Sequence, residues 1–126
     1  DGGNDNIYLP HNHIKNSVVY TGSHDNDTIL GWALHAPAHA LQYAVEYLRL
    51  DQREGYNWGM MKAAWASVSE LSVVTMQDLL DLGSEARMNT PSTTGGNWKW
   101  RMKKGAYNRG LSEKLRHMMY VYGRLR

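Results

Sequence analysis

The chain has 126 residues, of which 42% are hydrophobic, and a formal net charge of +2 at pH 7. This length fits one domain with a modest core, and it is too short for a complete (β/α)₈ barrel, which needs roughly 200 residues. Cysteine is absent, which excludes disulfides, thiolate metal sites and a cysteine nucleophile, and favours a cytoplasmic protein. No apolar run approaches the roughly 18 residues of a membrane span, so we expect no membrane partner.

The positive charge is concentrated in the C-terminal part of the sequence. Residues 97–126 contain nine Lys and Arg against Glu113, a net charge of +8, so residues 1–96 carry −6. A basic segment of this kind is one sign of nucleic-acid binding, but no RNA-binding or DNA-binding motif accompanies it. We interpret it as a solvated helix face that pairs with acidic surface, and we expect no nucleic-acid partner.

Residues 1–16 are predicted to form a loop. Pro10 imposes extended or turn geometry on its neighbour, and His11 and His13 alternate after it. A metal site would need a third ligand such as His24 or Asp25, and no carboxylate stands at a zinc-like spacing beside the two histidines. We interpret them as loop histidines with local hydrogen bonds, and we predict no metal.

Residues 17–28 are predicted to form a strand and a polar loop. Val18, Val19 and Tyr20 leave no polar face, which favours a strand buried on both sides. The run breaks at Gly22 and ends in the cluster His24-Asp25-Asn26-Asp27. An α/β barrel carries its catalytic groups at such strand ends. The alternative for Asp25 is the N-cap of the next helix.

Residues 36–69 are predicted to form two helices. The first shows apolar residues at three- and four-residue spacing from Leu41 to Leu48. The second is expected to begin at Asn57, with an apolar stripe made of Met60, Met61, Ala64, Trp65 and Val68.

A β-branched run at residues 72–76 predicts a second buried strand, followed by a helical turn that Gly83 closes. The order of strand, helix pair and strand is typical of βαβ construction. A last helix is predicted over residues 111–124, with Ser112 as its N-cap. The fold class is therefore α/β, rich in helix, with two or three short strands.

Residues 83–100 are predicted to form a long loop, because they are rich in Gly, Ser, Thr, Asn and Pro. Long ordered loops are often functional. This loop combines hydrogen-bonding side chains with indoles, which suits a sugar because its edges carry hydroxyl groups and its faces carry C–H groups. The alternative is a linker whose two Trp residues anchor it to the core.

Three segments, in this order along the chain, resemble signature sequences of the 4-α-glucanotransferases, also called amylomaltases or disproportionating enzymes. They are Tyr8-Leu9-Pro10-His11-Asn12, then Val19-Tyr20-Thr21-Gly22-Ser23-His24-Asp25-Asn26-Asp27-Thr28, then Gly83-Ser84-Glu85-Ala86-Arg87-Met88-Asn89-Thr90-Pro91 with Gly96-Asn97-Trp98-Lys99-Trp100-Arg101. The chain departs from the family pattern at Ser23, where Thr is frequent, and at Ser92, where Gly is common.

The resemblance implies the C-terminal part of a (β/α)₈ TIM barrel, incomplete on its own. It implies a transferase that moves α-1,4-glucan segments between maltooligosaccharides or to glucose, without a cofactor. Such retaining chemistry needs a nucleophile and an acid/base carboxyl about 5–5.5 Å apart. In the family these two groups lie on earlier barrel strands, so we predict that the isolated chain is inactive. We also expect its exposed barrel faces to favour self-association.

The same resemblance implies roles for single residues. Asp25 matches the Asp that stabilises the transition state, and His24 matches a sugar-binding histidine. We expect Asp27 to be a structural acceptor that orders the loop. Substrate binding or loop ordering is expected of four residues, Arg87, Asn89, Asn97 and Trp98. A non-catalytic carbohydrate-binding domain that uses the Trp98 loop is the alternative function.

Overall fold

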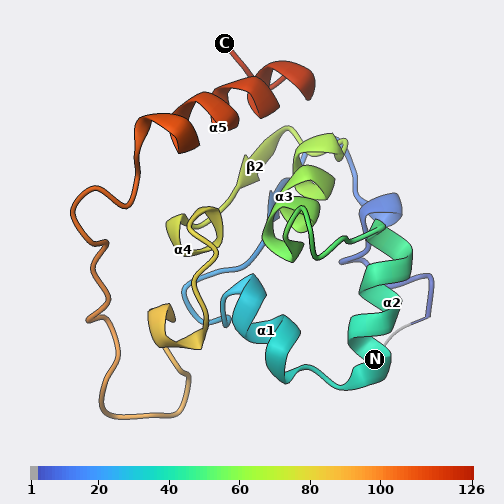
Figure 1. Cartoon of the computed structure of the whole chain (residues 1–126). Coiled ribbons are helices and arrows are strands. Elements are labelled where there is room, and N and C mark those ends of the chain that lie inside the picture. The colour runs from blue at the N-terminus through green and yellow to red at the C-terminus, as the bar shows by residue number, and fades with distance from the viewer. Residues whose placement is uncertain (1–2) are drawn as a thin grey trace.

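The computed structural model describes residues 3–126, which form a helix-rich chain around a small sheet (Figure 1). In chain order the elements are η1 (Pro10–Asn12), β1 (Val18–Tyr20), α1 (Ile29–His35), α2 (Ala38–Leu48), α3 (Tyr56–Ala66), β2 (Leu71–Val73), α4 (Met76–Leu79), η2 (Ser84–Ala86) and α5 (Arg109–Val121).

The two strands pair in parallel, with Val19 opposite Ser72, and the helices α1 to α3 connect them. The second strand was expected at residues 72–76, but it begins at Leu71 and ends at Val73. It ends early because Thr75 is the N-cap of α4, where its hydroxyl accepts a hydrogen bond from the Asp78 amide. A residue in that role cannot also continue the sheet.

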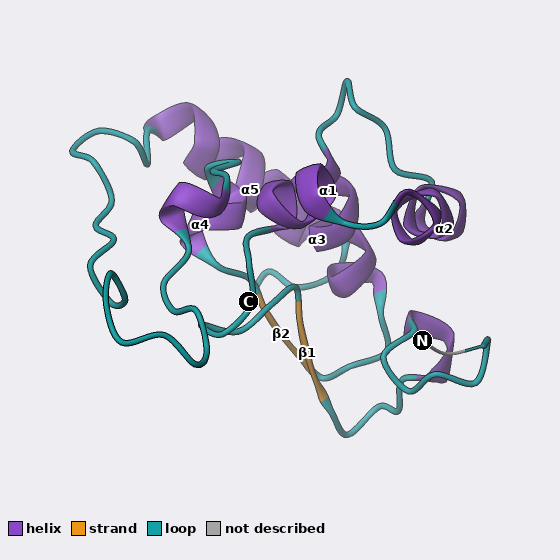
Figure 2. Ribbon diagram, turned by 90° about the horizontal axis from the view of Figure 1, so that it is seen from below, coloured by secondary structure: helices purple, strands orange, loops and turns teal. Residues whose placement is uncertain are grey.

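The prediction that β1 is buried on both sides is wrong for this chain. Val18 is 44% exposed and Tyr20 is 57% exposed, and Leu71 on β2 is 55% exposed. Figure 2 shows the reason, because the helices lie on one side of the two strands only. Side chains that alternate to the other side of the sheet have no helix to pack against.

The hydrophobic core is centred on α3. Met61 is fully buried there, and Trp58 and Trp65 lie on either side of it along the same helix. Ile29 of α1 and Leu79 of α4 complete the buried cluster, against which α5 packs its own apolar residues, Leu111, Leu115, Met118 and Met119. Figure 1 shows α5 lying across the end of α3 and β2.

One residue of the expected stripe does not belong to this core. Val68 is 59% exposed, because α3 ends at Ala66 and the backbone of Ser67 is already extended. The start of α3 at Tyr56 lies one residue before the predicted Asn57.

Helix α1 begins at Ile29, well before the helical region expected from residue 36. Thr28 is its N-cap, since the Thr28 hydroxyl accepts a 3.0 Å hydrogen bond from the Gly31 amide. The alternative that Asp25 caps this helix is therefore wrong. Pro37 occupies the N-cap position of α2 and separates the two helices.

Helix α5 begins at Arg109, and its N-cap is Asn108. The Asn108 side-chain oxygen accepts a 2.9 Å hydrogen bond from the Leu111 amide, so the prediction of Ser112 as N-cap is wrong. Both residue types are favoured caps, and the sequence alone does not rank them.

Arg124 attaches the end of the chain to the core. Its guanidinium donates to three backbone carbonyls, those of Trp65 at 3.0 Å, Ser67 at 3.2 Å and Glu70 at 3.2 Å. These carbonyls belong to the last turn of α3 and the link to β2, so one side chain satisfies acceptors that a helix end leaves open.

Within residues 3–126, no helix is both long enough and apolar enough to cross a membrane.

Candidate functional site

A tight turn after β1 presents the side chains of His24 and Asp25. The last ladder bond joins the Thr21 amide to the Val73 carbonyl at 3.3 Å. The Asn26 side-chain oxygen then accepts hydrogen bonds from the Ser23 amide at 2.7 Å and the Ser23 hydroxyl at 3.1 Å, which closes the turn. The His24 and Asp25 side chains are 57% and 51% exposed.

The Asp25 carboxylate is held on one oxygen only. Its Oδ1 accepts a 2.7 Å hydrogen bond from the Asn89 side-chain amide and lies 3.4 Å from His24 Nε2. Its Oδ2 has no hydrogen-bond partner among residues 3–126. The carboxylate is therefore oriented by the protein and still able to accept bonds from a ligand.

The loop of residues 83–100 is joined to this turn through the main chain as well. The Asn89 amide donates to the His24 carbonyl at 3.1 Å. The Arg87 guanidinium donates to the Asp25 carbonyl at 2.7 Å and to the Asn89 carbonyl at 2.9 Å. Arg87 thus joins the turn of residues 22–28 to the loop of residues 83–100.

A fourth link joins Asp27 to η2. Asp27 Oδ2 accepts a 2.7 Å hydrogen bond from the Ser84 hydroxyl, and Asp27 Oδ1 accepts from the Thr28 amide at 2.8 Å. The expectation that Asp27 is a structural acceptor agrees with these contacts. Gly31 leaves the room for this link, because a Cβ there would lie 2.5 Å from Ser84 Oγ and 2.7 Å from Asp27 Cγ.

Trp98 lies beside His24, with ring centroids 5.0 Å apart. Its backbone is left-handed, with φ of 62°, and its amide donates to the Met88 carbonyl at 2.7 Å. A bulky residue in this conformation is strained, and such strain is concentrated at functional sites. The indole is 55% exposed and borders a cavity of about 210 Å³ together with His24, Arg87 and Met88.

Asn97 is not brought to Asp25. Its side-chain oxygen accepts from the Thr90 amide at 2.9 Å, and its side-chain nitrogen donates to the Thr93 hydroxyl at 2.9 Å. These contacts close the loop of residues 90–97 on itself. Of its two expected roles, the structure shows loop ordering.

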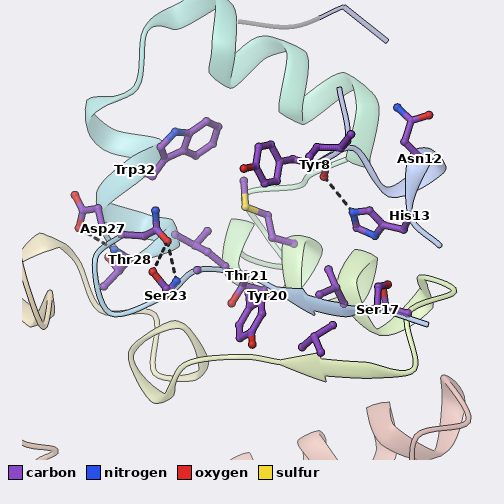
Figure 3. Close-up of a pocket in the computed structure, with 18 of the residues that line it drawn as sticks. Tyr8, Asn12, His13, Ser17, Tyr20, Thr21, Ser23, Asp27, Thr28 and Trp32 are labelled. Atoms are coloured by element: carbon purple, nitrogen blue, oxygen red, sulfur yellow. Dashed lines mark hydrogen bonds between the residues drawn. The ribbon is translucent and has the colours of Figure 1, made fainter. Parts of the chain in front are cut away.

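A larger open cavity of about 980 Å³ lies along β1, on the side away from β2 (Figure 3). Tyr8 and His13 of the N-terminal segment face Trp32 of α1 across it. Asp27 and Thr28 lie at its end near Trp32, so the two cavities share the turn of residues 22–28 as a wall.

The expectation of local hydrogen bonds is right for His13 but incomplete for His11, which also contacts Tyr47 of α2. The ring of His11 lies against the Tyr47 hydroxyl and bonds to the Asn4 carbonyl at 2.7 Å, and His13 bonds to the Tyr8 carbonyl at 3.2 Å. Over residues 3–126, no group of three or more His, Cys, Asp or Glu is arranged to hold a metal ion.

The sequence profile of glycoside hydrolase family 77, described as 4-α-glucanotransferase, matches residues 1–107. The chain belongs to the 4-α-glucanotransferase family. A 4-α-glucanotransferase from Clostridium butyricum is 47% identical over 124 residues, which is 98% of this chain and 26% of that protein. A chloroplastic/amyloplastic 4-α-glucanotransferase from rice (Oryza sativa subsp. japonica) is also 47% identical, over 98% of this chain and 21% of that protein.

The fold agrees with that of a family member. The structure of an amylomaltase from Streptococcus agalactiae in complex with acarbose superimposes with a TM-score of 0.90 at 36% identity. The match covers 95% of this chain and 24% of the amylomaltase. The chain thus spans about a quarter of the length of the glucanotransferases it matches.

Sequence reasoning missed three residues that build this part of the glucanotransferase fold: Gly31, Asp78 and Ser84. Thr75-x-x-Asp78 has the form of a capping box. This signal would have drawn attention to Asp78, but as a residue that caps α4. Ser84 lies in the third signature segment and Gly31 in none, but no local pattern shows the role of either residue, because each acts through a contact with Asp27 that only the fold creates.

Proposed function

We propose that this chain supplies the transition-state-stabilising carboxylate, Asp25, and part of the glucan-binding surface of a 4-α-glucanotransferase. The reaction would transfer α-1,4-glucan segments between maltooligosaccharides or to glucose, by retaining double displacement and without a cofactor. The proposal rests on one observation: His24 and Asp25 lie on an exposed turn, and Trp98 of the following loop lies against His24. One Asp25 oxygen accepts a hydrogen bond from Asn89, and the other is available to a ligand.

The geometry suits these roles. A retaining transfer passes through an oxocarbenium-like transition state, which a fixed carboxylate stabilises. Asn89 holds Asp25 in place by Oδ1, so Oδ2 accepts bonds from sugar hydroxyls. His24 donates to a neighbouring hydroxyl, and the exposed Trp98 indole stacks against the C–H face of a sugar ring.

The rest of the machinery is proposed to lie outside these 126 residues. The nucleophile and the acid/base are supplied by the remainder of a family-length (β/α)₈ barrel, in which β1 and β2 are two of the strands. The chain alone is then inactive, and its uncovered strand faces, with Val18, Tyr20 and Leu71 exposed, favour self-association. A cytoplasmic location, expected from the absence of cysteine, remains part of this proposal.

Disproportionation of maltotriose tests the proposal. The chain is assayed alone, mixed with the preceding part of a family member, and as a chimera in which it replaces the matching 124-residue segment of the Clostridium butyricum enzyme. We expect activity in the chimera and none in the chain alone. Asp25→Asn should remove nearly all of the chimera's activity, whereas the matched control Asp5→Asn, an exposed carboxylate of the N-terminal segment, should not.

Two results would contradict the proposal. Turnover by the chain alone would show that it contains a catalytic pair. An active chimera that tolerates Asp25→Asn would show that this carboxylate does not stabilise the transition state.

A second candidate is a carbohydrate-binding domain without catalysis, favoured by the exposure of Trp98 beside His24. It predicts that maltotriose quenches or shifts the fluorescence of the chain, that Trp98→Ala abolishes this change, and that a folded chimera makes no transfer product. Maltotriose binding together with transfer in the chimera would favour the glucanotransferase over the non-catalytic binding domain.

A further inference from the structure

Asp78 is a buried carboxylate that bonds to both ends of the turn carrying His24 and Asp25. It is 3% exposed. Its Oδ2 accepts a 3.0 Å hydrogen bond from the Thr21 hydroxyl, where β1 ends, and its Oδ1 accepts a 2.8 Å hydrogen bond from the Ile29 amide, where α1 begins. We propose that Asp78 is a positioning residue for glucan transfer, which sets the turn of residues 22–28 by fixing both of its ends. This inference rests on the function proposed above.

The Asp78 carboxylate does not serve its own helix. In a capping box the acidic side chain returns to the amide of the N-cap residue, here Thr75. Among the described hydrogen bonds, both Asp78 oxygens are instead used by residues 49 and 57 positions away in sequence. The Thr75 hydroxyl still accepts from the Asp78 amide at 3.2 Å, so α4 keeps half of the motif.

Asp78 is itself fixed to the core. Its carbonyl accepts a 2.7 Å hydrogen bond from the Asn57 side chain, which is 2% exposed on α3. Hydrogen bonds therefore connect α3, through Asp78, to Thr21 and Ile29. Between these two residues the turn is held by Asn89 and Arg87 of the loop of residues 83–100, whereas Asp78 bonds to the residues at its two ends.

The types of donor that bond to Asp78 allow its hydrogen bonds to be separated from its charge by substitution. An Asn at position 78 can still accept from the Ile29 amide through its oxygen, and it can donate to the Thr21 hydroxyl, which rotates to accept. Asp78→Asn therefore preserves both contacts, Asp78→Ala removes both, and Thr21→Val removes one. The role depends on hydrogen-bond geometry and does not depend on charge.

The first experiment measures amide hydrogen exchange in the chain itself. We expect Asp78→Ala to increase exchange at residues 22–31, Thr21→Val to increase it at the first of these residues, and Asp78→Asn to leave the pattern close to that of the wild type. Leu79→Ala is the matched control, because it weakens the buried side of α4 and leaves in place the Asp78 carboxylate and its hydrogen bonds to Thr21 and Ile29. Increased exchange confined to α4 in Asp78→Ala would overturn the proposal.

The second experiment measures transfer in the Clostridium butyricum chimera, with kcat normalised to the folded fraction. We expect Asp78→Ala to lower kcat about 10-fold to 100-fold with little change in KM, because a misplacement of about 1 Å has effects of that size. Asp78→Asn should restore most of this loss. Leu79→Ala should lower thermal stability and leave the normalised kcat near that of the wild type.

The outcomes separate the two proposals. An active chimera whose normalised kcat is unaffected by Asp78→Ala overturns the positioning role and leaves the proposed function intact. A folded chimera without any transfer activity overturns the proposed function, and with it the catalytic meaning of Asp78, even where the exchange data show that Asp78 holds the turn.

Discussion

The side-chain amide of Asn89 donates a 2.7 Å hydrogen bond to Asp25 Oδ1 across 64 residues of sequence. Because Asn89 also donates its backbone amide to the His24 carbonyl, one residue fixes both the backbone and the carboxylate of the turn. The second and third signature segments are therefore bonded to each other, and the orientation of Asp25 depends on the loop that follows η2.

Replacing Asn89 by Asp tests this dependence. The substitution replaces the amide that donates to Asp25 Oδ1 by a carboxylate, which repels Asp25 and cannot donate to it. We expect Asn89→Asp to reduce kcat of the chimera at least about 10-fold, as for the loss of one preorganised donor. Asn97→Asp is the matched control, since Asn97 bonds within its own loop. Equal losses in both variants would show that the loop matters only as a whole.

The close approach at Gly31 makes a second prediction. Gly31→Ala places a methyl group 2.5 Å from Ser84 Oγ, so the bond between Ser84 and Asp27 must break or α1 must shift. We expect a loss of about 1–3 kcal/mol in the free energy of unfolding, measured by urea denaturation. The control is Gly110→Ala in α5, where the nearest atom is 3.4 Å away.

At Gly110 the same substitution should stabilise the chain by up to about 1 kcal/mol, because alanine is the better helix former. A Gly31→Ala variant as stable as the wild type would mean that the Asp27–Ser84 contact contributes nothing to stability.

Arg124 gives a third prediction, about the attachment of α5. Arg124→Ala leaves three carbonyls, at the end of α3 and in the link to β2, without their donor, and we expect the free energy of unfolding to fall by about 1–3 kcal/mol. Arg124→Lys should recover only part of this, since an ammonium group cannot reproduce the planar fork. Arg126→Ala, an exposed arginine two residues later, is the control. Trp fluorescence during urea unfolding measures all three variants, and equal effects of the two Ala variants would argue against a specific attachment.

Asp81 gives a fourth prediction, about pH. Burial, together with repulsion from Asp78, raises the pKa of Asp81 above its ordinary value of 3.8. A carboxyl group whose pKa is higher in the folded state destabilises the fold when ionised, and this penalty is absent when the group is protonated in both states.

Asp81→Asn should therefore raise Tm slightly at pH 7, and this gain should shrink well below pH 3.8. Asn also tolerates the left-handed backbone at this position, where φ is 53°. Thermal unfolding followed by circular dichroism at both pH values measures the effect. Asp5→Asn provides the same change of charge on an exposed residue, and a pH dependence equal in both variants would refute the prediction.

The sequence predicted the parts of the site that lie in local patterns. His24 and Asp25 follow a β-branched run, and Asn89 and Trp98 lie in a loop of unusual composition, so each segment was recognisable and the family resemblance brought them together. Helix existence was also readable, because apolar spacing marks α2 and α3.

The remainder depends on contacts that no local pattern contains. Asn108 and Ser112 are both good caps, and only the fold selects Asn108. The exposure of Val18 and Tyr20 depends on which elements cover the sheet, and no sequence pattern marks the left-handed backbone of Trp98 or its bond to Met88. Asp78 looks like part of a capping box, but the partners of its carboxylate are Thr21 and Ile29, which precede it in sequence by 57 and 49 residues.

The second and third signature segments are joined by both side-chain and main-chain hydrogen bonds. This affects the recombination of family members. The donations from Arg87 and from the Asn89 backbone end on carbonyl oxygens, which any parental sequence provides. The pairs Asp25 with Asn89 and Asp27 with Ser84 join side chain to side chain, so both partners must come from compatible parents. A single crossover between residues 28 and 83 separates the partners of both pairs in every offspring, so functional offspring should arise only from parents whose residues at these four positions are compatible.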